Sequence, residues 1–134
     1  MRFLMTTALL ATLGGTAHAE MATYKLDPEH TTVFFTVDHI GYAKTLGLFT
    51  TVEGGFEYDA ETRELGDVAV TIDAASVESF NEARDAHLRE SDFLDVARHP
   101  AITFTATGGS AASETSGTVT GDLTILETEA MKMD

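Results

Sequence analysis

The most informative stretch of the sequence for the fold is FNEARDAHLRESDFLDVARHPAITF, residues Phe80 to Phe104. Asn81 is a good helix N-cap, because its side-chain oxygen accepts from a free backbone N–H of the first turn. Asp85 and Arg89 are spaced i,i+4 and are expected to pair on the helix surface. Pro100 ends any helix, since the residue before a proline avoids the α region. The segment therefore predicts one short helix followed by a strand.

Outward from this block, the chain alternates apolar and polar residues with a period of two, which is typical of half-buried strands. Leu48 to Tyr58 is predicted to be one extended segment with a bend at its glycine pair, and Gly41 to Gly47 is predicted to be a loop. Many short strands with one helical insertion indicate an antiparallel sheet that curls toward a barrel. The apolar positions are Val33, Phe35, Val37, Val68, Val70, Ile72, Ile102, Phe104, Ala106, Val119, Leu123 and Ile125.

The first 19 residues differ from the rest. A basic Arg2, a short apolar run and the Ala17-His18-Ala19 site predict a cleavable secretory signal peptide over residues 1–19. We therefore expect a periplasmic or secreted protein with a single domain over residues 20–134.

All 22 acidic residues follow the predicted signal, and the whole chain has a formal net charge of −14. Such a surface repels nucleic acid and anionic headgroups. There is no cysteine, which excludes thiol chemistry and cysteine-ligated metals. No spacing typical of a nucleophilic or zinc enzyme is found, so we predict a non-enzymatic protein without a metal or a cofactor.

Four blocks of this sequence resemble the YceI-like family. The third block is the most specific, because Arg84, Asp85, His87, Leu88 and Arg89 are followed by Asp92-Phe93 and then by His99-Pro100 before a strand. The resemblance covers essentially all of the chain after the predicted signal. The blocks are YKLDPEHTTVFFTVDHIGY (Tyr24–Tyr42), GLFTTVEGGFEYD (Gly47–Asp59), NEARDAHLRESDFLDVARHPAITF (Asn81–Phe104) and GDLTI (Gly121–Ile125).

This resemblance implies a mainly β protein, an antiparallel lipocalin-like β-barrel with a short helical insertion. It also implies a carrier that holds an isoprenoid or another long-chain lipid in an apolar tunnel. In the family, further strands follow the fourth block, whereas here only residues 127–134 follow Leu126. We therefore expect an incomplete barrel in which the strand from Val119 to Leu126 is a sheet edge, or nearly so. We also expect the chain to be unstable, to dimerise through that edge or to aggregate.

The predicted ligand-binding residues form two groups. Seven apolar residues should line the barrel interior, where they touch either a lipid or one another. Arg84, Asp85 and His87 should lie at the tunnel mouth or tie the helix to the barrel, and His39 is either a core histidine or a ligand contact. The seven apolar residues are Phe35, Val37, Val52, Phe56, Val70, Ile72 and Phe104.

The sequence thus predicts an envelope lipid carrier that meets a membrane or a membrane protein only transiently. An exported stress-response or structural interaction module with a packed barrel is the alternative, and an enzyme using Arg84, Asp85 and His87 is a weaker one. The identity of the lipid, the physiological partner and the oligomeric state do not follow from the sequence.

Overall fold

The computed structural model describes residues 20–126 and 128–133, and within them it is mainly antiparallel β with one short α-helix. The elements are β1 (Ala22–Lys25), β2 (Val33–His39), β3 (Ala43–Phe49), β4 (Val52–Asp59), β5 (Glu64–Asp73), the 3-10 helix η1 (Ala74–Ser76), β6 (Val77–Glu78), α1 (Glu82–Leu88), β7 (Ala101–Ala106), β8 (Gly109–Ala111), β9 (Gly117–Val119), β10 (Gly121–Ile125) and β11 (Thr128–Met133). The predicted fold class is confirmed, and the sheets of the described residues do not close into a barrel.

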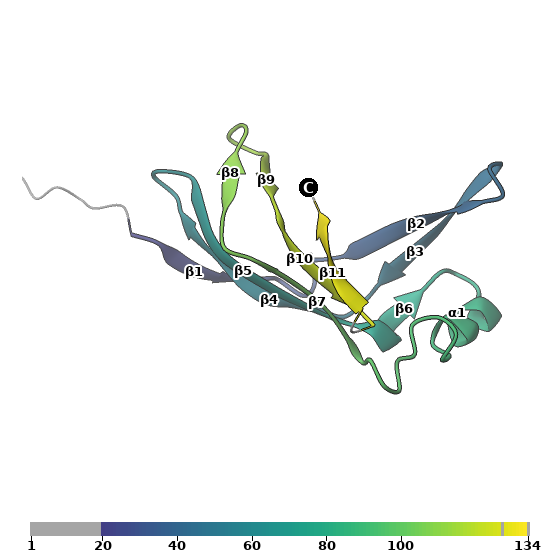
Figure 1. The fold of residues 1–134 in the computed structure, drawn as a ribbon. Coiled ribbons are helices and arrows are strands. Elements are labelled where there is room, and N and C mark those ends of the chain that lie inside the picture. The colour runs from purple at the N-terminus through teal and green to yellow at the C-terminus, as the bar shows by residue number, and fades with distance from the viewer. Residues whose placement is uncertain (1–19, 127, 134) are drawn as a thin grey trace, which may run out of the picture.

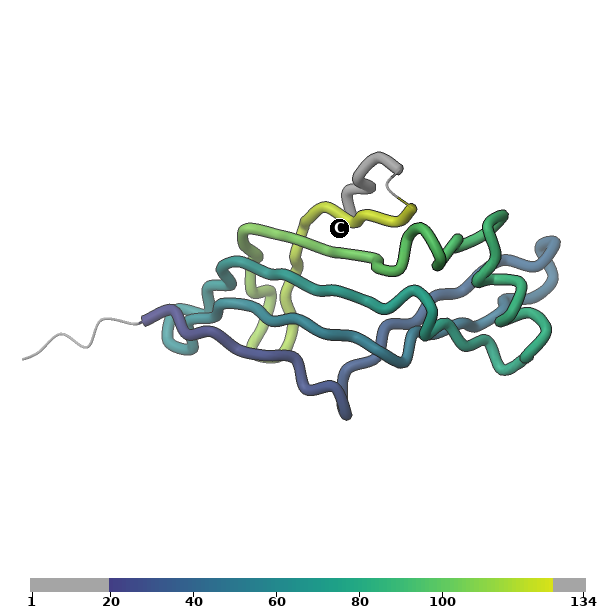
Figure 2. Tube along the Cα trace, turned by 90° about the horizontal axis from the view of Figure 1, so that it is seen from below, coloured from purple at the N-terminus to yellow at the C-terminus, as the bar shows by residue number. Residues whose placement is uncertain are grey.

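The strands form two sheets. The larger sheet has the order β1-β4-β5-β7-β10-β11, and the β8–β9 hairpin attaches to it at β5. Figure 2 shows β1, β4, β5 and β7 lying side by side along this sheet. The smaller sheet has the order β2-β3-β6. In Figure 1 the larger sheet is curved, and the β2–β3 hairpin and the β8–β9 hairpin rise from its two ends on the same side.

A small core joins the two sheets. Phe49 and Val77 of the smaller sheet pack with Val52, Ile72 and Ile102 of the larger one, and all five are buried. Val77 has no exposed surface. Burying apolar area is the main driving force for folding, so this cluster fixes how the smaller sheet sits on the larger.

The predicted loop from Gly41 to Gly47 is wrong. Only the turn at its start is irregular, and β3 pairs with β2 along its whole length, from Ala43 opposite His39 to Phe49 opposite Val33. Gly47 is a strand residue, and a Cβ there would lie 2.2 Å from Cζ of Phe35. This glycine therefore makes room for an aromatic ring and does not end a strand.

The single extended segment predicted from Leu48 to Tyr58 is also wrong. The chain leaves the smaller sheet after Phe49 and enters the larger one at Val52, so two strands share this stretch. The register shift in β4 lies between Phe56 and Tyr58, next to the glycine pair where the bend was expected.

The prediction of one strand from Val119 to Leu126 at or near the sheet edge holds only in part, because the stretch lies next to the edge strand but is not a single strand. This stretch contains two strands, β9 and β10, and β11 pairs with β10 on the side away from β7. The outer strands of the larger sheet are β1 and β11 in the part of the chain described here.

Candidate functional site

One face of the larger sheet carries a continuous row of apolar side chains, which we call the apolar strip. Directly opposite residues in antiparallel strands point to the same face. Val52, Ile72 and Ile102 are such partners, and so are Val70, Phe104 and Leu123. The strip consists of Tyr24, Val52, Phe56, Val68, Val70, Ile72, Ile102, Phe104 and Leu123.

Burial falls along the apolar strip. At the end beneath the smaller sheet, Val52 is 3% exposed and Ile72 is 5% exposed. Farther along, Phe56, Val70 and Phe104 are only half-buried. At the far end Tyr24 stacks on Phe56 with ring centroids 5.5 Å apart. The strip thus runs from a dry core to a partly open apolar surface.

Two adjacent glycines allow β4 to lie close to both of its neighbours. A Cβ at Gly54 would stand 2.2 Å from the carbonyl oxygen of Ala69, and one at Gly55 would stand 2.3 Å from that of Tyr24. Gly54 also has a φ of +148°, which side-chain-bearing residues rarely adopt. The pair keeps the strip continuous across three strands.

The β2–β3 hairpin carries three of the predicted site residues. Phe35 contacts Phe49, with ring centroids 5.5 Å apart, and packs against the core. Val37 and His39 follow Phe35 on the same face of β2 but lie farther out and are exposed. The structure thus places Val52, Phe56, Val70, Ile72 and Phe104 on one face, with Phe35 beside them. Ligand contact at these residues stays a prediction.

Arg84 and Asp85 meet at Ser79, which precedes the helix. The Arg84 side chain donates to the Ser79 hydroxyl from Nε at 2.7 Å and to the Ser79 carbonyl from Nη2 at 2.6 Å. Asp85 accepts from the Ser79 backbone N–H at 2.8 Å and from its hydroxyl. We call this trio the Ser79 hub, and it ties helix α1 to the end of β6.

The environment of Asp85 favours its ionised form. The Ser79 hydroxyl, acting against the opposing effect of burial, lowers the pKa of Asp85, and the Ser79 amide and the nearby Arg89 charge lower it further. The carboxylate is thereby held as an acceptor inside the hub.

Arg89 does not form the hydrogen-bonded pair with Asp85 that the spacing indicated. Its guanidinium instead donates to the carbonyls of Ala75 at 2.8 Å and Val77 at 2.7 Å. The sequence analysis missed Ser79 and treated Arg89 only as a helix-surface partner. The signal for Ser79 is weak in sequence, since a serine before an N-cap has many other uses.

His87 lies on the exposed side of the helical block. Its Nε2 is 3.0 Å from Asp92 Oδ2 and 3.9 Å from Glu90 Oε2, and its ring meets Phe93 edge-on. The three polar side chains offer ligand atoms within 4.8 Å of one another. Oxygen and imidazole donors suit divalent metals, but all three residues are exposed, as surface acids commonly are.

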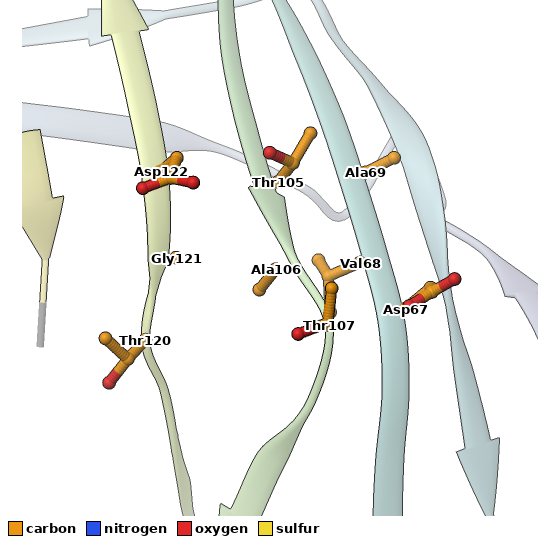
Figure 3. A pocket seen from close by; sticks show the side chains of 9 residues that line it. All are labelled: Asp67, Val68, Ala69, Thr105, Ala106, Thr107, Thr120, Gly121 and Asp122. Atoms are coloured by element: carbon orange, nitrogen blue, oxygen red, sulfur yellow. The ribbon is translucent and has the colours of Figure 1, made fainter. Parts of the chain in front are cut away.

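A pocket of about 500 Å³ lies where β7 and β10 separate (Figure 3). Ala69, Thr105 and Asp122 are register partners on the face opposite the apolar strip. Asp67 and Thr107 add further polar atoms. Val68 of the apolar strip and its register partner Ala106 also line this pocket, whereas none of the predicted ligand-binding residues does.

The described residues form an antiparallel β protein with an apolar strip on one side of a curved sheet. A family model described as the YceI-like domain matches residues 24–132. The chain belongs to the YceI-like family.

Relatives and solved structures agree with this assignment. The chain is 38% identical over 120 residues to a UPF0312 protein of Azotobacter vinelandii and 38% identical over 123 residues to the protein YceI of Escherichia coli. These matches cover 88% and 90% of this chain, but 62% and 63% of those proteins. The chain therefore spans less than two thirds of the length of these relatives.

The crystal structure of the Campylobacter jejuni YceI protein superposes with a TM-score of 0.63 at 32% identity and covers 82% of this chain and 64% of that one. Burkholderia cenocepacia BcnA superposes with a TM-score of 0.68 at 23% identity, over 80% of this chain and 66% of that one, and shows the fold alone. Among the described residues, no helix is both long and apolar enough to cross a bilayer.

Proposed function

We propose that this chain binds the apolar chain of a lipid, such as a polyisoprenoid, along the apolar strip, and that it does so as an exported, non-enzymatic carrier. One observation carries the proposal. Phe56, Val68, Val70, Phe104 and Leu123 share one face, and each is only half-buried.

The chemistry of the strip suits a hydrocarbon. Each methylene removed from water contributes about 0.8 kcal/mol, so a long chain lying along five half-buried apolar residues gains affinity without any directional contact. The strip residues are aliphatic or aromatic, and none carries a formal charge. Membership of the YceI-like family supports a binding function over a catalytic one.

The Ser79 hub gives no support to head-group binding by Arg84 and Asp85. The Nε and Nη2 donors of Arg84 are already engaged by Ser79, and the Asp85 carboxylate accepts from the same residue. The proposed site is therefore the strip alone, and a role for Arg84, Asp85 or His87 in lipid contact stays a prediction.

The test uses two neighbouring residues on opposite faces of β5. Val68 lies on the strip, whereas the exposed Ala69 lies on the other face. Val68→Trp should fill part of the strip and lower the lipid that co-purifies from envelope extracts, measured by native mass spectrometry. Ala69→Trp adds the same ring on the other face and should leave the lipid load unchanged. If folded Val68→Trp and Ala69→Trp proteins carry equal amounts of lipid, a ligand on the apolar strip is refuted.

A further inference from the structure

The β2–β3 hairpin extends away from the rest of the molecule (Figure 1). The residues of its turn include exposed apolar side chains. Its base is held in the core by Val33 and Phe35. Its turn carries Ile40, which is 79% exposed, and Tyr42, which is 92% exposed. Scattered exposed apolar residues are ordinary on proteins, but here they gather at the end of a projecting element.

Apolar side chains are exposed on both faces of this hairpin. Phe34 and Leu46 lie on one face, 69% and 44% exposed, and Val37 lies on the other face at 56%. A protein partner that docks on a hairpin covers one of its faces. A medium that surrounds the tip, such as the interfacial layer of a bilayer, covers both, and the distribution of exposed residues matches the second case.

The charge of the hairpin also differs from that of the chain. The whole chain has a formal net charge of −14, yet residues 30–52 contain a single acidic residue, Asp38. Its carboxylate lies 3.7 Å from Lys44 Nζ, so the formal charges of the hairpin cancel. A neutral tip on an acidic body is the part of the molecule that approaches a lipid surface with the least repulsion.

The turn is compact and is closed by one backbone hydrogen bond. Ile40 and Gly41 have φ values of +45° and +75°, and the Tyr42 N–H donates to the His39 carbonyl at 3.1 Å. A β-branched residue at positive φ is a genuine outlier, and such strain often marks a functional position.

We propose that the tip of the β2–β3 hairpin, with Val37, Ile40, Tyr42 and Leu46, inserts into the interfacial layer of a lipid bilayer. This inference builds on the proposed function, because it names the place where a lipid-binding chain meets the membrane that supplies the lipid. Tyrosine is enriched at this depth of membranes, where its ring is apolar and its hydroxyl is wet.

The chain contains no tryptophan, so one substitution gives a specific reporter. Tyr42→Trp should show a blue-shifted emission when phosphatidylcholine vesicles are added, and lipid-attached bromine should quench it. Phe80→Trp is the matched control, since Phe80 is 67% exposed at a site outside the hairpin. Its emission should not change. Adding Ile40→Asp to the Tyr42→Trp variant should weaken vesicle partitioning roughly ten-fold, as expected for the loss of one buried aliphatic side chain.

Two results would overturn the insertion. One is an unchanged Tyr42→Trp spectrum at saturating vesicle concentration. The other is a blue shift that grows with protein concentration without vesicles, which would assign the tip to a second copy of the chain. Lipid load, measured separately by mass spectrometry, keeps the two proposals distinct. If the protein carries lipid but the Tyr42→Trp emission does not respond to vesicles, the inference alone is refuted. If the emission responds but no lipid co-purifies, the proposed carrier function alone is refuted.

Discussion

Arg84 is joined to Ser79 by two hydrogen bonds, one from Nε to the hydroxyl at 2.7 Å and one from Nη2 to the carbonyl at 2.6 Å. The Ser79 hydroxyl also donates to Asp85, so one small side chain connects a cation and an anion of the same helix. The hub holds α1 against the end of β6 and carries the first prediction.

Ser79→Ala should lower the free energy of unfolding by about 1–3 kcal/mol, because Arg84 and the buried Asp85 each lose the hydrogen bond to the Ser79 hydroxyl and keep only the one to its backbone. Urea denaturation measures this loss. Ser91→Ala, at an exposed position of the same block, is the control and should change stability little. A Ser79→Ala protein as stable as the control would contradict the structural role of the hub.

Arg84→Ala should destabilise the fold in the same direction while the lipid load of each folded molecule stays constant. Melting curves and mass spectrometry on the same preparation measure the two quantities. Reduced load at unchanged stability would instead assign Arg84 to the ligand.

Acid should weaken the fold through Asp59 as well as Asp85. The backbone N–H of Thr62 lowers the pKa of Asp59, and that of Glu61 lowers it further, with Oδ1 3.0 Å and 2.8 Å from the two nitrogens. A carboxyl whose pKa is lower in the folded chain stabilises the fold above its unfolded pKa. That stability is lost as the pH falls through the folded value.

Melting temperature should therefore fall as the pH drops below about 4, the ordinary range for an aspartate. Asp59→Asn should be less stable than the wild type at pH 7 and should show a flatter decline below pH 4. Thermal melts from pH 7 to pH 3 test this. Parallel curves for the two proteins would show that Asp59 contributes nothing to the acid response.

Two glycines should respond differently to alanine. Gly41 has a positive φ but open space around its missing side chain, so Gly41→Ala should cost about 1–2 kcal/mol from backbone strain alone. Gly54→Ala adds a Cβ 2.2 Å from a backbone oxygen and should cost distinctly more. Equal losses in urea denaturation would mean that β4 and β5 can move apart freely.

Export remains a proposal, because residues 1–19 lie outside the described residues. If Ala17-His18-Ala19 is a cleavage site, the protein recovered from the periplasm or the medium should begin at Glu20. N-terminal sequencing that finds Met1 on cytosolic protein would remove the localisation.

Self-association through an outer strand is the remaining proposal. Outer strands present unpaired backbone groups, and lysine is the residue that most often blunts them. The wild type should therefore sediment as a dimer at high concentration. Thr23→Lys on β1 together with Ala130→Lys on β11 should shift it to monomer. A wild type that stays monomeric at every concentration would exclude this route.

Local patterns in the sequence predicted the helix and several strands well. The Asn81 side chain caps α1 by accepting from the Arg84 N–H at 3.0 Å, as expected from its position before the helix. The alternation of Val68, Val70 and Ile72 places them together on one face of β5. These features depend on neighbours within a few residues, which a sequence shows directly.

Features that depend on distant partners were not predictable in the same way. Gly47 looked like a loop residue because its partner, the Phe35 ring, comes from another strand. Ser79 is bound by two side chains from the helix that follows it, and Arg89 donates to carbonyls of η1 and β6. The placement of the apolar strip followed from alternation, but its falling burial depends on how the two sheets pack.

The pairing of β1 with β4 encloses the whole β2–β3 hairpin, because Lys25 is the partner of Gly55. The β2–β3 and β4–β5 hairpins join strands that follow each other closely, so they can form while the chain is still largely extended. The strand β1 can pair only after β4 has formed, and the entropy cost of closing the intervening loop slows this pairing further. We therefore expect the amino-terminal strand to be the last to lock during folding and the first to be released under strain.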